Sequence, residues 1–235
     1  MRLPATYFDI STTATFTPPV TVCINYSNVT FPGNESSLKL MHFEGGVWKN
    51  VTVSRDTVNN IICGSVTSFS FFVIAQDTTA PTVNVAVTTS RLSPPTHDLV
   101  NVGLSVSATD NGGVSPSSLP VAVFGDEDDQ EPTANNEVFS PDARNIAPNT
   151  LRLRAERKNS GDGRVYLIVV KFVDDVGNVG FNCATVVAPK GNDPKSVNSA
   201  NTQAAAARTF CLGNNGNAPP GFFVIGDGPV IGSKQ

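Results

Sequence analysis

The sequence predicts an all-β fold: two antiparallel immunoglobulin-like β-sandwich domains followed by an irregular C-terminal tail. Two observations lead to this prediction. Hydrophobic side chains alternate with polar ones at period two, and short runs of β-branched and aromatic residues are separated by Gly, Pro, Asn and Asp. Of the 235 residues, 40% are hydrophobic and only 15% are charged. The chain can therefore fill a core while Ser, Thr, Asn and Gly cover most of its surface.

The first domain is predicted to span residues 1–76. In the segment 20–26, Val, Ile and Tyr alternate with Thr, Cys and Asn, and the segment 38–43 alternates in the same way. Gly45 and Gly46 follow the second segment and predict a hairpin turn, because paired glycines accept a positive φ without steric cost. Further strands are expected at 47–53 and 66–74, with another turn at 56–60.

The second domain is predicted to span residues 77–190, after a polar stretch that ends at Pro81. A series of short strands with turns between them is typical of an immunoglobulin-like sandwich. The expected strands are 83–89, 99–109, 119–124, 150–156, 164–173 and 180–188.

The tail, residues 191–235, is rich in Gly, Asn and Ala. Its Ala-rich run 204–208 predicts one or two helical turns, and 222–225 is a lone apolar run of strand-forming residues. We expect the tail to form an arm, irregular in part, that is tethered by Cys211.

The four cysteines indicate an oxidising compartment. Cys23 and Cys63 lie in the first half of the chain and Cys183 and Cys211 in the second, and none belongs to a C-x-x-C motif. Four cysteines allow three connectivities, of which we favour Cys23–Cys63 and Cys183–Cys211 because each bond then stays within its own half. Disulfides predict a secreted, extracellular protein, whereas four buried free thiols would indicate a cytosolic one.

Charge and motif content argue against several classes of function. The net charge is −4 and Lys and Arg do not cluster, so a nucleic-acid partner is not expected. No apolar run approaches the roughly 18 residues that a membrane span needs. The chain has two histidines, His42 and His97, and no Gly-x-Ser-x-Gly motif, so we predict that it is not an enzyme.

Acidic residues at strand ends and turns predict a Ca²⁺ site, because Ca²⁺ binds about six to eight carboxylate, amide and carbonyl oxygens. The candidate ligands are Asp110, Glu127, Asp128, Glu156, Asp162 and Asp174, with Asn178 as an alternate. In the alternative interpretation, Asp110 and Asp174 are turn residues that accept hydrogen bonds from nearby backbone amides, and the run 126–129 is a solvated loop. Arginines flank Glu156, and we predict cross-strand ion pairs there rather than an anion site.

The first half contains YFDISTTATF at 7–16, VTVCINY at 20–26, LKLMHF at 38–43, WKNVT at 48–52 and ICGSVTSFS at 62–70. Together these segments resemble a β-domain that recurs in large secreted or surface-anchored bacterial proteins. In that family the segment is usually the C-terminal part of a longer unit. The resemblance therefore implies that the first domain is incomplete.

The second half contains APT at 80–82, PPTH at 94–97, SATDN at 107–111, LRLRAER at 151–157, GDGRVY at 161–166 and DDVGN at 174–178. This combination resembles a bacterial immunoglobulin-like repeat related to hyalin repeats. Family members often carry two cysteines where this chain has Gly112 and Val173, so that disulfide is absent here. The Cys183–Cys211 bond is expected to clamp the tail instead.

The two resemblances imply a structural or adhesive module of a bacterial surface or filament protein, with calcium as a stabilising ion. An incomplete first domain would leave an open sheet edge, which is a template for strand pairing. The run 222–225 of a neighbouring copy would complete that edge by β-strand addition. The expected partners are thus other copies of the chain or neighbouring domains of a larger protein.

The alternative function is a non-catalytic accessory module of a secreted hydrolase that binds polysaccharide. Trp48 and the phenylalanines would then offer a stacking platform, although core or interface packing is the more common role of such residues. Apolar residues on both faces of the strand 69–74 indicate that this strand is covered on both sides.

Overall fold

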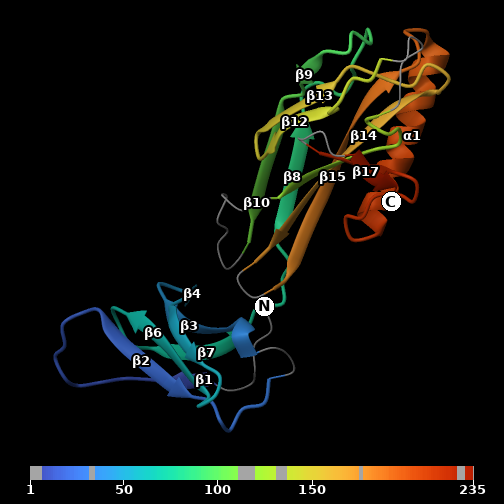
Figure 1. The fold of residues 1–235 in the computed structure, drawn as a ribbon. Helices are drawn as coiled ribbons and strands as arrows, with labels where there is room; N and C mark the ends of the chain where they lie inside the picture. The colour runs from blue at the N-terminus through green and yellow to red at the C-terminus, as the bar shows by residue number, and fades with distance from the viewer. Residues whose placement is uncertain are drawn as a thin grey trace. The chain divides into compact units, whose positions relative to one another are not determined.

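The computed structural model describes residues 7–31, 35–110, 120–130, 137–174, 177–226 and 231–234. It divides into two compact units, both built mainly from strands (Figure 1). The first unit comprises Met1–Ala80, Asp110–Gly113 and Val173–Asn178, and the second comprises Pro81–Thr109, Val114–Phe172 and Val179–Gln235. The all-β prediction is confirmed, and the immunoglobulin-like character of the two units stays a prediction.

The strands of the first unit form two antiparallel sheets, with orders β1-β7-β3-β4 and β2-β6-β5. A short 3-10 helix, Glu35–Ser37, precedes β3. The strands are β1 (Tyr7–Asp9), β2 (Val20–Asn25), β3 (Leu38–Glu44), β4 (Val47–Asn50), β5 (Thr52–Asp56), β6 (Ile61–Val66) and β7 (Phe71–Gln76).

The two sheets of the first unit enclose one core. Its buried residues come from both sheets, among them Ile24 and Ile62 on one side and Leu40 and Phe72 on the other. The period-two pattern explains this arrangement, because alternate side chains of a strand point to the same face. In β2, for example, Val22 and Ile24 are buried while their neighbours are exposed.

Two predicted turns are confirmed. Glu44 pairs with Val47, so Gly45 and Gly46 form a two-residue hairpin, and their φ values of +63° and +83° are of the kind that glycine adopts without strain. In the turn between β5 and β6, the Oδ1 atom of Asp56 accepts hydrogen bonds from the backbone amides of Val58 and Asn59, at 3.1 and 3.0 Å.

The second unit contains three sheets, with orders β10-β8, β15-β14-β11-β16-β17 and β12-β13-β9. A large core of residues from all three sheets, including Val106, Leu153 and Ile168, holds them together. The strands are β8 (Thr82–Val87), β9 (Leu99–Asn101), β10 (Leu104–Thr109), β11 (Val121–Gly125), β12 (Ala143–Ala147), β13 (Thr150–Arg154), β14 (Gly163–Val173), β15 (Val179–Pro189), β16 (Phe223–Ile225) and β17 (Ile231–Lys234).

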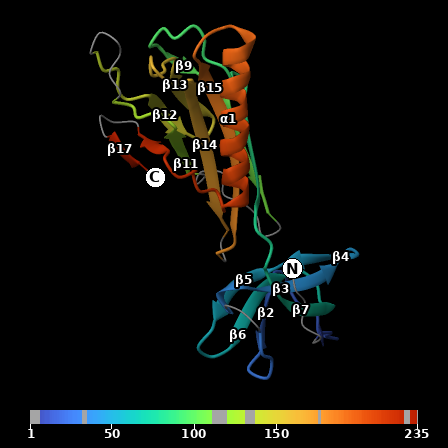
Figure 2. The same cartoon turned by 90° about the vertical axis from the view of Figure 1, so that its right-hand side faces the viewer.

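The tail is more regular than predicted, because it contains a 20-residue helix, α1 (Pro194–Gly213). Asp193 caps its N-terminus by accepting a hydrogen bond from the Ser196 amide at 3.0 Å, and Pro194 occupies the first turn. The helix lies along β15 (Figure 2). Its buried face consists of three alanines and Cys211, and small residues of this kind give only a weak hydrophobic pattern in the sequence.

The lone apolar run in the tail is paired within its own chain. β16 adds to β11 with the register Val123–Ile225, Phe124–Val224 and Gly125–Phe223. Ile225 is buried in the core of the second unit. The run 222–225 therefore contributes a strand to the sheet of its own chain.

Both predicted disulfides are present. Cys23 and Cys63 lie directly opposite each other on β2 and β6, with their Cα atoms 4.1 Å apart. Cys183 on β15 is bonded to Cys211 on α1. The described helices include none that is long and apolar enough to cross a bilayer.

Candidate metal centre

Asp77 follows directly after β7, at the end of the first unit's four-stranded sheet. Its backbone amide donates to the Ser37 carbonyl oxygen at 3.2 Å, which extends the pairing of β7 with β3 by one step. Its Oδ1 atom accepts a hydrogen bond from the Thr79 amide at 3.1 Å. The residue is 2% exposed, so its carboxyl group is held in a buried turn.

Asp174 follows β14 and closes a turn with Asn178. The Asp174 Oδ1 atom accepts from the Asn178 amide and Oδ2 accepts from its Nδ2, both at 2.8 Å. The same Nδ2 donates to the Asp77 carbonyl oxygen at 3.3 Å, which ties this turn to Asp77. Asp174 thus has the turn geometry predicted as an alternative to metal binding, and that geometry also fixes the direction of its carboxylate.

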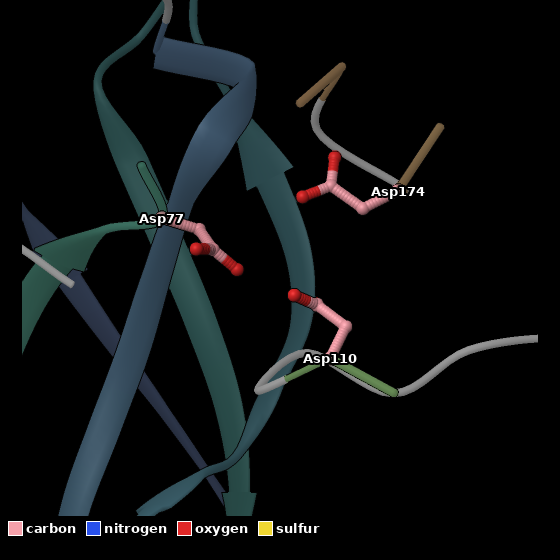
Figure 3. A group of neighbouring side chains, drawn as sticks. All are labelled: Asp77, Asp110 and Asp174. Carbon is pink, nitrogen blue, oxygen red and sulfur yellow. The ribbon is translucent and has the colours of Figure 1, made fainter. Parts of the chain in front are cut away.

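Asp110 follows β10 and completes a group of three carboxylates. One oxygen from each of Asp77, Asp110 and Asp174 lies within 4.8 Å of the other two. Figure 3 shows the three side chains pointing toward one another. All three residues belong to the first unit, although the chain brings them from positions far apart in the sequence.

The donor set fits a hard divalent cation. Ca²⁺ and Mg²⁺ prefer carboxylate oxygens, and neighbouring backbone carbonyls or water complete their coordination. Ionised carboxylates whose oxygens lie within 4.8 Å of one another repel, and a bound cation would offset this repulsion. Within the described residues, this is the group of acidic side chains whose geometry suits a metal ion.

The structure divides the six ligands predicted from the sequence. Asp110 and Asp174 meet at the cluster with Asp77. The other four lie in the second unit and are engaged there by protein groups. Glu127 and Glu156 face Arg164; Asp128 accepts from the Gln130 amide at 3.1 Å; Asp162 accepts from the Gln203 Nε2 atom at 3.0 Å.

Sequence reasoning misses Asp77 because the polar stretch around it predicts a domain boundary and not a site. The residue nevertheless shares one feature with Asp110 and Asp174: each Asp directly follows a strand. An acidic residue at the end of a strand, before a turn, is the signal that could have found it.

The two histidines lie at separate places. The Nε2 atom of His42 lies 3.1 Å from the Ser70 Oγ atom, and its ring stacks on Phe72. The Ser70 hydroxyl donates to the Phe43 carbonyl oxygen at 2.5 Å, so His42 is placed as a donor to Ser70 and not as its base. His97 lies 3.0 Å from the Glu156 carboxylate. The absence of enzymatic activity stays a prediction.

Comparison of the chain with protein-family models, with curated proteins and with solved structures finds no match.

Proposed function

We propose that this chain is an extracellular structural or adhesive module of a surface or filament protein. The observation that carries the proposal is that each unit has its own disulfide, since such bonds persist in oxidising compartments. Cys23–Cys63 joins two strands and Cys183–Cys211 joins a helix to a sheet. Bonds of this kind stabilise the folded state by limiting the freedom of the unfolded chain.

Negative-stain electron microscopy of the protein from its native source tests the structural role. Regular fibres, or arrays on a cell surface, that label with an antibody to this chain would support it. Dispersed particles found only inside cells would contradict it.

We further propose that Asp77, Asp110 and Asp174 hold a divalent cation, with Ca²⁺ as the expected ion. The cation would neutralise the three carboxylates and join three segments of the first unit. Removing it with EDTA should lower the melting temperature, because a ligand that binds only the folded state stabilises that state by mass action.

Isothermal titration calorimetry with CaCl₂ measures this binding directly. The chelated wild-type protein is expected to bind one Ca²⁺ ion per chain at this cluster, and Asp77→Asn to lose that binding. Asp9→Asn is the matched control, since Asp9 is an exposed carboxylate of the same unit outside the cluster. Equal Ca²⁺ binding by Asp77→Asn and wild type would refute the assignment.

Assembly by β-strand addition stays part of the proposal in a modified form. Because β16 already pairs with β11, a neighbouring copy can receive this strand only if the strand leaves its own sheet. Exchange of a terminal segment between identical copies is a recognised route to oligomers.

A cysteine pair at Phe124 and Val224 distinguishes the two states. These residues lie opposite each other on adjacent strands, where Cβ atoms are close enough for a disulfide. In Phe124→Cys/Val224→Cys, pairing within one chain leaves a monomer on a non-reducing gel, whereas exchange produces a ladder of covalent oligomers. A monomer band under conditions in which the wild type polymerises would refute strand exchange.

One observation favours the alternative, polysaccharide-binding function. The ring centroids of Tyr7 and Phe43 lie 6.2 and 5.2 Å from that of Trp48, and strand register places Phe71 on the same sheet face. Tyr7 and Phe71 are 56% and 48% exposed. Binding on a glycan array that is lost in Trp48→Ala but kept in Val58→Ala, a control at another exposed apolar residue, would support this function.

A further inference from the structure

The second unit contains a buried group of charged residues around Arg164. The guanidinium of Arg164 is fully buried and contacts Glu127 at 3.0 Å, Glu156 at 3.9 Å and Asp142. Arg154 also donates to Asp142, at 3.1 Å. Buried charges of this kind need partners of opposite sign, because the interior does not solvate them as water does.

Negative charge is in excess in this group. The segment after β11 supplies Asp126, Glu127, Asp128 and Asp129, while Asp142 and Glu156 approach from either side of the β12–β13 hairpin. The positive groups are Arg154 and Arg164, with Arg157 next to Glu156 in the chain and His97 bonded to Glu156. Three of the acids, Asp126, Asp128 and Asp129, form no ion pair with the described residues, and Asp128 accepts a hydrogen bond from the Gln130 amide instead.

Asp129 is buried and, within the described part of the chain, lacks hydrogen-bond donors for its carboxylate oxygens. Its side chain is 1% exposed, and neither carboxylate oxygen accepts a hydrogen bond from any residue that the structure describes. An ionised carboxylate in that position lacks the donors that it requires. A protonated Asp129 carries an O–H group, and the adjacent Asp128 carboxyl can accept it.

Asp126 links the same segment to β14. Its Oδ1 atom accepts a hydrogen bond from the Val165 amide at 2.8 Å, and its own amide donates to the Val165 carbonyl oxygen at 3.2 Å. Burial raises the pKa of Asp126 to about 7, opposed by the Val165 amide. Burial, followed by the charge of Asp128, raises the pKa of Asp129 to about 6.

We propose that Asp126 and Asp129 form a proton-operated latch, which holds the segment 126–130 against β14 in mildly acidic medium and releases it as the pH rises through neutrality. The direction of this pH effect follows from the linkage between proton binding and closure of the segment. A carboxyl group that binds its proton more tightly in the closed state favours that state when protonated, and this contribution is lost as pH rises toward the closed-state pKa. Each such group changes the opening equilibrium by up to about tenfold per pH unit.

Hydrogen exchange of the wild-type protein between pH 5 and pH 8 tests the latch. After correction for the intrinsic pH dependence of exchange, protection of the Val165 amide and of residues 126–130 should fall at least about tenfold across this range. Protection in β15 should change much less, because β15 does not contact the two acids through any described hydrogen bond. Uniform protection from pH 5 to pH 8 would overturn the proposal.

Three variants identify the titrating groups. Asp129→Asn should reduce the pH dependence and leave the contribution of Asp126. Asp162→Asn, a control at an exposed carboxylate of the same unit, and His97→Gln, which removes the histidine bonded to Glu156, should both retain it. Undiminished pH dependence in Asp129→Asn, or loss of the pH dependence in His97→Gln, would contradict the assignment.

A second measurement covers the case in which Asp129→Asn does not fold. Infrared spectra of the wild-type protein at pH 5 should contain a carbonyl band from protonated carboxyl groups that disappears by pH 8, and absence of the band at pH 5 would overturn the proposal. Addition of CaCl₂ at pH 8 should not restore protection in the segment 126–130. Restoration there would show that a cation, and not a proton, balances the charge.

Discussion

Removing the Cys23–Cys63 disulfide separates the contribution of a cross-link to the free energy of unfolding from the contribution of core packing. Cys23 is exposed and Cys63 is half-buried, on the face of β2 and β6 that points away from the core residues Ile24 and Ile62. The double variant Cys23→Ser/Cys63→Ser therefore removes the bond and leaves the core intact. Its effect should come mainly from the greater freedom of the unfolded chain.

The magnitude follows from the length of the closed loop. The two cysteines are 40 residues apart, and a loop of that length contributes about 4 kcal/mol to the free energy of unfolding. With a urea dependence of about 1–2 kcal/mol per M for a small unit, the unfolding midpoint should fall by about 2–4 M.

Fluorescence of Trp48 provides the assay, because the chain has one tryptophan and it lies in the first unit. Thr21→Ala/Ser65→Ala is the matched control, since these residues are another directly opposed pair on the same two strands, and its midpoint should change by less than about 0.5 M. An equally small change in the cysteine variant would refute the reasoning. Reduction of the wild-type protein should reproduce the cysteine variant.

Three further outcomes follow from the structure. Burial lowers the pKa of His42 below its usual value, so the unfolded chain binds the proton more tightly than the folded chain does. The first unit should therefore lose stability as pH falls below about 6.5, with an increase of up to about tenfold per pH unit in its unfolding constant. Unfolding followed by Trp48 fluorescence should show no such loss in a folded His42→Gln variant. Gly180→Ala should destabilise the second unit by about 1–3 kcal/mol in thermal unfolding, because a Cβ atom there would lie 2.0 Å from the Pro81 carbonyl oxygen. The control Gly213→Ala should change the stability little, because a Cβ atom at that position meets no other atom within 4 Å. Asp193→Ala removes the N-cap of α1 and should lower stability by about 1 kcal/mol in the same assay.

Strand-rich architecture was predictable because alternation is a local signal. In β2, the alternation of apolar and polar residues indicates which side chains face the core. Gly45 and Gly46 indicate the turn that follows β3. β12 was missed because its sequence, ARNIA, does not alternate. It pairs with β13 through a register shift, and neighbouring strands decide such pairing more than intrinsic preference does.

Helix α1 and the pairing of β16 depend on tertiary contacts. The buried face of α1 is made of small residues such as Ala204 and Ala207, which fit against Val165 and Val187 but give little periodic contrast on their own. Nothing in the run 222–225 identifies β11 as its partner, because strand pairing between distant segments leaves no mark in either one alone.

The candidate metal centre was half predictable for the same reason. Asp110 and Asp174 are predictable ligands because they are acidic residues at strand ends, and Asp77 meets the same criterion. Which strand ends converge is a property of the topology. Glu127 and Glu156 met the sequence criterion equally well but face Arg164, which lies on β14 and is buried.

The central proposal is that the Cys23–Cys63 disulfide and a cation together stabilise the first unit as part of an extracellular scaffold. Thermal unfolding followed by Trp48 fluorescence, in oxidised and reduced protein and with either CaCl₂ or EDTA, tests it in one experiment. We expect the highest melting temperature in the oxidised protein with CaCl₂, and a separate decrease on reduction and on chelation. One melting temperature under all four conditions would contradict the claim.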